Sequence, residues 1–248
     1  MAATIDDLTA HLAPPLAPPR PAGPWLLLAP VAVAAAVLGV VAADRVEIVA
    51  ADWVRLALVI AWTAAGVSAL RQAALHHAAR LVLGGAVLGA VSFATARYAA
   101  TSTGTASDVA GLVAPLACLG VIAMSAHFLL ALPDGHLRTR ARLVGAIGAY
   151  AGALVVGLLV WSSQGELSVG VGAWAWTITI LLCLPAAHRR YLASAGLVRQ
   201  RLQWLGCGAT LAGEVGLAMG ALRVLVGWPE HAGAIAAVGT GLLPLAIA

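Results

Sequence analysis

Few side chains in this sequence could do chemistry, and Glu214 is the first of them. It is a carboxylate within an apolar stretch, between Gly213 and Gly216. An ionisable group near the centre of a bilayer costs roughly 2.5–3.5 kcal/mol on insertion scales, so we expect Glu214 to face the bundle interior with a partner or a proton. Arg223 follows nine residues later, about 13 Å along a helix. Two interpretations stay open: hydrogen bonding between helices, or a ligand-binding or proton-sensing pocket that includes Arg223.

The histidines and cysteines do not gather as metal or catalytic sites require. His76 and His77 adjoin in a short hairpin without an acidic neighbour, and His127 has no second ligand at metal-like spacing. No glycine-rich nucleotide loop is present. We therefore expect no catalytic residue, no metal and no cofactor in these residues. The three cysteines lie in or beside apolar runs and are expected to be small buried hydrophobes: Cys118, Cys183 and Cys207.

The composition is that of a protein solvated by lipid. Of the 248 residues, 62 % are hydrophobic and only 10 % are charged, and the mean hydropathy is +0.96. Soluble domains carry about 25 % charged residues. The apolar runs are too continuous for barrel strands, and spans of other kinds must be helical. The sequence predicts an all-α, polytopic integral membrane protein of about eight transmembrane helices, at residues 25–43, 53–70, 81–96, 109–132, 143–161, 169–187, 205–226 and 232–248.

Residues 1–24 differ from this transmembrane domain of residues 25–248. Proline at positions 14, 15, 18, 19 and 21 predicts an extended linker, and the segment is expected to be a cytoplasmic tail. A cleavable signal peptide within residues 1–43 is the competing interpretation, since Arg20 precedes the first apolar run.

The charges between the apolar runs predict the orientation in the membrane. Ten of the fourteen arginines fall on one side of the predicted bundle, whereas the other side collects six of the acidic residues. The positive-inside rule places the arginine-rich side in the cytoplasm. Both termini are then cytoplasmic, and the localisation is the plasma (inner) membrane. The net charge of +4 comes from arginines spread over helix ends, so we expect no nucleic-acid partner.

Two cytoplasmic segments stand out. In the first, Pro133, Asp134 and Gly135 predict a tight turn, followed by three arginines that anchor the next helix at the headgroups: Arg138, Arg140 and Arg142. The second, residues 188–204, interleaves arginines with apolar and aromatic residues. One interpretation is a positively charged loop that sets the topology. The other is a segment that lies on the inner leaflet and reports helix tilt or lipid charge. Its contact residues would be Arg189, Arg190, Arg199, Arg201 and Trp204.

These segments resemble the membrane-embedded N-terminal sensor region of actinobacterial two-component histidine kinases. The similar residues are Leu132-Pro133-Asp134-Gly135-His136-Leu137 with its arginines, Arg199-Gln200-Arg201-Leu202-Gln203-Trp204 before a late span, and the ending Leu242–Ala248. The resemblance implies a signal-input region that acts through downstream kinase domains and a response regulator, and as a possible homodimer. Neither a phosphoacceptor domain nor an ATP-binding domain lies within these residues, so kinase activity would require a longer protein.

The alternative is a stand-alone membrane protein, such as a small transporter or a subunit of a membrane complex. A transporter favours broken helices with convergent polar groups at the midplane, and the sequence offers one such acid. A membrane enzyme would need clustered histidine or carboxylate residues at one face, and the histidines here are scattered.

Overall fold

The computed structural model describes residues 23–41, 50–72, 75–132, 135–163 and 169–228, together with Ile235 and Val238. Within these ranges the side chains at positions 50, 51 and 197 and those of part of α7 are not described. Every regular element in these ranges is a helix. The elements in chain order are η1 (Gly23–Leu27), α2 (Leu28–Val41), α3 (Ala50–Leu70), α4 (His76–Thr101), α5 (Thr105–Ala131), α6 (Arg140–Ser162), α7 (Val169–Leu192) and α8 (Gly196–Val226).

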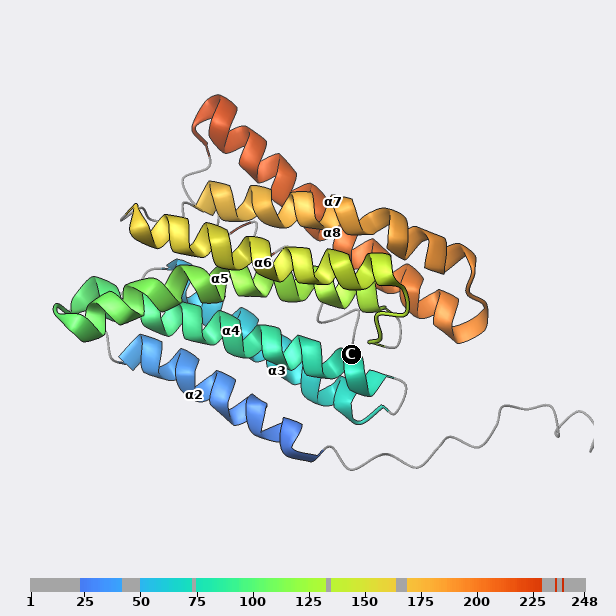
Figure 1. Ribbon diagram of the computed structural model, residues 1–248, viewed down its shortest axis with the longest axis horizontal. Helices are drawn as coiled ribbons and strands as arrows, with labels where there is room; N and C mark the ends of the chain where they lie inside the picture. The colour runs from blue at the N-terminus through green and yellow to red at the C-terminus, as the bar shows by residue number, and fades with distance from the viewer. Residues whose placement is uncertain are drawn as a thin grey trace, which may run out of the picture.

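The helices lie side by side, and α8 crosses the others at an angle (Figure 1). The α3–α4, α5–α6 and α7–α8 turns and the start of α2 share the right-hand end of the bundle in this view, and the α4–α5 turn lies at the opposite end. Six helical segments of the described residues are long and apolar enough to cross a membrane. These are features of a multi-pass membrane protein.

The predicted spans agree with the helices in place but not in length. The third, 81–96, is too short, because α4 runs from His76 to Thr101 and includes Arg97. The helix α7 covers the predicted sixth span, while the eighth lies outside the described residues apart from Ile235 and Val238. Residues 188–204 are not a loop: α7 and α8 take up most of this segment and leave only residues 193–195 between them. The count of eight spans stays a prediction.

The core forms around α4, which packs against α2, α3 and α5. Small residues allow this, since alanines at positions 32, 36, 79 and 90 are completely buried. At Gly66 of α3, an added Cβ would stand 2.7 Å from Leu83 of α4. The two helices therefore approach closely here, as small residues permit in membranes. The helices α6 and α7 pack against α5, and α8 packs against α7 and adds Leu202 and Leu205 to the core cluster.

Leu83 tests the packing of this core. Its side chain is 0 % exposed, so Leu83→Ala is expected to lower the free energy of unfolding by about 2–5 kcal/mol through lost contacts and a residual cavity. Denaturation in mixed detergent micelles measures the change. Leu182 on α7 is 76 % exposed, and Leu182→Ala is the matched control with a change below about 1 kcal/mol. Equal effects of the two variants would contradict the assignment of this core.

Candidate functional site at the arginine-rich end

The turn after α5 is held directly against the start of α4. Gly135 has φ +81°, and a Cβ at this position would lie 2.5 Å from the amide nitrogen of Ala78 and 2.6 Å from Cβ of His77. The Gly135 N–H donates to the carbonyl of Ala131 at 2.8 Å. The predicted Gly135 turn is thus also a contact between helices. Pro133 and Asp134 lie outside the described residues.

A buried cluster joins four helix ends beneath this turn. Leu70 ends α3, Leu132 follows α5, and both are almost completely buried. Leu202 and Leu205 at the start of α8 belong to the same cluster, together with Ala79 of α4. Leu132 and Leu202 come from two of the segments that carry the resemblance to sensor kinases. The fold therefore brings these two segments, seventy residues apart in sequence, into one packed unit.

Histidines lie beside the cluster and are part of its packing. The Arg80 guanidinium donates to Nε2 of His76 at 2.9 Å and stacks over the Trp25 ring at 4.7 Å. Since a guanidinium can only donate, Nε2 of His76 is the acceptor. The rings of His77 and His136 lie 4.3 Å apart, between α4 and the turn. The described residues contain no group of three or more metal-ligating side chains.

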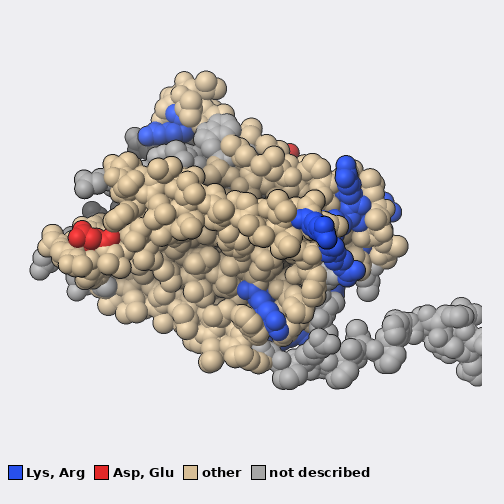
Figure 2. Space-filling model, in the orientation of Figure 1, with Lys and Arg blue, Asp and Glu red and all other residues tan. Residues whose placement is uncertain are grey.

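Three arginines at this end were predicted to lie at the lipid headgroups, and the structure leaves Arg138 and Arg140 exposed and Arg142 half-buried. Arg138, Arg140 and Arg142 flank the start of α6, which the Thr139 hydroxyl caps by accepting from the Arg142 N–H. Arginine side chains gather at the right-hand end of the molecule, with a wide belt of uncharged residues beside them (Figure 2).

The arginines of the α7–α8 turn make defined contacts. Arg199 stacks on Tyr191 at 4.9 Å, and Arg201 donates to Oε1 of Gln72 at 3.3 Å. Arg189 is exposed, Arg190 is partly buried, and Trp204 is 63 % exposed. Gln72 belongs to the α3–α4 turn, so a hydrogen bond connects this turn to the start of α8.

The structure places Glu214 and Arg223 differently from the expectation. Glu214 does not face the bundle interior; it is exposed on α8. The reason is its register: α8 buries Leu205, Ala209, Ala212 and Gly216, and a residue two positions from Ala212 points to the opposite side of a helix. Arg223 is exposed too and donates to the carbonyl of Gly227. The two side chains are not brought together.

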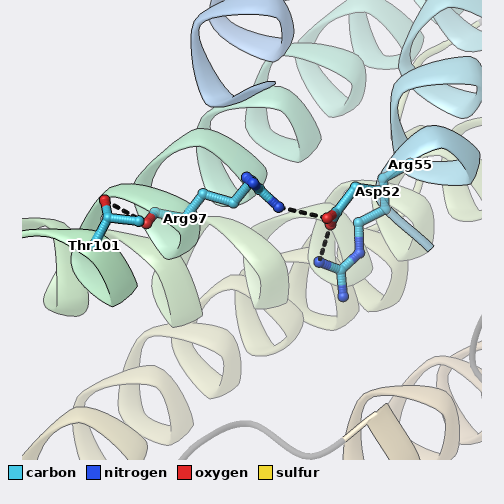
Figure 3. A network of polar contacts seen from close by, with 4 residues as sticks. All are labelled: Asp52, Arg55, Arg97 and Thr101. Carbon is cyan, nitrogen blue, oxygen red and sulfur yellow. Dashed lines mark hydrogen bonds and ion pairs between the residues drawn. The ribbon is translucent and has the colours of Figure 1, made fainter. Parts of the chain in front are cut away.

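At the opposite end, the structure shows an ion pair that sequence reasoning missed. Asp52 of α3 and Arg97 of α4 are 4 % and 8 % exposed, with 2.5 Å between Oδ2 and a guanidinium nitrogen. Arg55 approaches the same carboxylate at 3.8 Å, and the Thr101 hydroxyl donates to the carbonyl of Arg97 (Figure 3). From the sequence, Asp52, Arg55 and Arg97 are counted only among the charges on the outer side of the predicted bundle. One feature of the sequence could have predicted the pair: two opposite charges lie at the same end of two consecutive predicted spans.

No family model, no curated protein and no solved structure matches the chain.

Proposed function

We propose that this chain is the membrane-embedded signal-input region of a two-component histidine kinase, in the plasma membrane, with its arginine-rich end in the cytoplasm. The observation that carries the proposal is the packed unit at that end. The Gly135 turn lies against the start of α4, Arg201 of α8 donates to Gln72 of the α3–α4 turn, and Leu132 and Leu202 share one buried cluster. The Gly135 turn and the start of α8 bear the motifs of the resembling sensor regions. A shift of α3, α4, α5 or α8 would change this shared contact.

Signalling through such a unit requires two bundle arrangements that differ by a few kcal/mol. The cluster of Leu70, Leu132, Leu202 and Leu205 couples α3, α5 and α8. A signal that shifts α3 or α5 therefore reaches α8, and through it the residues that follow. In the competing function, a stand-alone transporter, polar groups would converge in the middle of the bundle. The buried ionisable side chains of the described residues lie instead near the helix ends, at Asp52, His76 and Arg97.

The kinase assignment is tested on the native protein. Antibodies against this chain are used to isolate the protein from native membranes. The isolated protein is then supplied with labelled ATP. We expect acid-labile, alkali-stable phosphate on a histidine of a product larger than the 24.9 kDa of this sequence, or on a kinase that co-purifies with it. A native product of 24.9 kDa without phosphorylation in itself or in a partner would overturn the proposal.

The orientation is tested by cysteine labelling. In a variant without the three native cysteines, Asp108→Cys is expected to react with a membrane-impermeant maleimide in intact cells. Arg140→Cys is expected to react only after permeabilisation, because the arginine-rich end faces the cytoplasm. Both positions are exposed, so access to the reagent is limited by the membrane alone. The reverse pattern would invert the proposed orientation.

A further inference from the structure

Arg80 is a cation at the arginine-rich end with few partners in the protein. It lies four residues after His76, the first residue of a candidate span, and its side chain is partly buried. A guanidinium has five N–H donors, and the described residues offer Arg80 one acceptor, Nε2 of His76 at 2.9 Å. The N–H on Nε is buried and has no acceptor. Arg80 therefore has donors to spare for a ligand that carries oxygen acceptors.

The charge of Arg80 is not balanced by the protein, in contrast to that of Arg97. At the opposite end of α4, Arg97 is paired with the Asp52 carboxylate. The structure describes three acidic residues, Asp52, Asp108 and Glu214. None of the three lies at the arginine-rich end, and no described residue forms an ion pair with Arg80. A charge that is partly removed from water without a counterion is costly, so we expect an anion from the surroundings to bind here.

The surroundings of Arg80 place that anion at the level of the lipid headgroups. The guanidinium stacks over the indole ring of Trp25 in η1 at 4.7 Å, and indole rings gather at the membrane–water interface. Leu26 and Leu27, which follow Trp25, are exposed apolar residues. The helices α2 and α4 pack together, and both begin at the right-hand end of the bundle (Figure 1). A phosphate bound to Arg80 therefore has apolar surface beside it for acyl chains.

We propose that Arg80 binds the phosphate of one anionic phospholipid, between η1 and the start of α4. The planar fork of arginine matches two phosphate oxygens, and basic residues at a membrane surface attract anionic headgroups. The site is separate from residues 188–204, because it holds a single lipid against two helices. Leu28 and Ala29 pack on the buried cluster, so the bound lipid stabilises the contact of α2 with the packed unit. This inference requires only that the arginine-rich end lies at a membrane surface, and it is independent of the proposed sensor role.

The stability of the full chain in two lipid mixtures tests the site. Mixed micelles hold either phosphatidylcholine alone or phosphatidylcholine with increasing fractions of phosphatidylglycerol. Phosphatidylglycerol is expected to raise the midpoint of thermal unfolding, because a ligand that binds only the native state stabilises it. Arg80→Gln should weaken the apparent affinity for this lipid about tenfold to hundredfold, since hydrogen bonds to charged groups are among the strongest. Arg80→Lys should weaken it less, because lysine keeps the charge but not the fork.

Arg140→Gln is the matched control. Arg140 is an exposed arginine at the same end, and its replacement should change the apparent affinity by no more than about twofold, as expected of screened surface charges. Arg80→Gln also loses the contacts with His76 and Trp25. Loss of those contacts alone would lower the midpoint equally in both mixtures, whereas loss of the lipid site removes the difference between the mixtures.

Phosphatidylglycerol with brominated acyl chains locates the bound lipid, because bromine quenches the fluorescence of nearby tryptophan. It is expected to quench the native protein more than brominated phosphatidylcholine does. Trp25→Phe should remove most of this excess, and Trp204→Phe should not. Trp204 is the control because it is 63 % exposed at the same end and reports any diffuse gathering of anionic lipid.

Three outcomes would overturn the proposal. One is a midpoint that phosphatidylglycerol does not raise. Another is a gain that Arg140→Gln reduces as much as Arg80→Gln, or excess quenching of Trp204 instead of Trp25, since either would mean a diffuse attraction to the arginines. The third is the same gain from inorganic phosphate in phosphatidylcholine micelles, which would make this a site for a free anion. The kinase assay has no bearing on these measurements, so failure of one proposal is distinguished from failure of the other.

Discussion

Replacing Gly135 with alanine is expected to lower the free energy of unfolding by about 2–5 kcal/mol. Two costs add: a left-handed backbone for a residue with a Cβ, about 1–2 kcal/mol, and overpacking, about 1–3 kcal/mol. The overpacking arises because the new methyl group would lie 2.5 Å from the amide nitrogen of Ala78. Denaturation of the purified protein in mixed micelles measures the sum.

A second glycine separates the two costs. Gly227 ends α8 with φ +72°, and a Cβ there would meet nothing within 4 Å. Gly227→Ala therefore carries the backbone cost alone and should lose only about 1–2 kcal/mol. Equal losses at the two positions would mean that the Gly135 turn does not press on α4. In the proposed sensor, Gly135→Ala should also change signal output when the protein is compared at equal abundance.

Breaking the ion pair between α3 and α4 is the second large effect. Asp52→Ala is expected to cost about 3–5 kcal/mol, because it leaves the buried Arg97 guanidinium without its carboxylate. The double variant Asp52→Ala, Arg97→Met should recover much of this loss, since an apolar pair of similar volume removes the uncompensated charge. A double-mutant cycle on the free energy of unfolding measures the coupling of the two residues.

Arg55 is the control for this cycle. It approaches the same Asp52 carboxylate, at 3.8 Å, but its side chain is 50 % exposed. Arg55→Ala should therefore cost no more than about 1 kcal/mol, as for exposed pairs in general. An Arg55→Ala loss as large as that of Asp52→Ala would show that Arg55, and not Arg97, balances the carboxylate. Additive effects of Asp52→Ala and Arg97→Met would show that the pair does not form.

The helical class and the position of most spans could be predicted from sequence, because uninterrupted apolar runs of about twenty residues have few other solutions. The helix ends could not. The helix α4 starts at His76, five residues before the predicted span, because His76 and Arg80 satisfy one another. A hydropathy profile does not report such contacts between side chains, so it could not predict where this helix begins.

The candidate site was predictable in its parts and not in its assembly. The Gly135 turn followed from its residue types, but its contact with His77 depends on where α4 begins. The exposure of Glu214 was predicted wrongly. The sequence showed that a carboxyl group at this position is costly to place in lipid. It did not show which side of α8 packs inward, because that side is set by the contacts of Ala209, Ala212 and Gly216 with other helices.

The Asp52–Arg97 pair also constrains how the chain enters the bilayer. On the proposed orientation Arg97 must be carried across the membrane to reach its place, and without a partner its charge would oppose the insertion of its helix. Asp52 begins α3 and Arg97 is near the end of α4, so a hairpin of the two helices brings both charges to one end. We therefore expect the ribosome-bound chain to insert α3 and α4 together, as one electrically balanced hairpin.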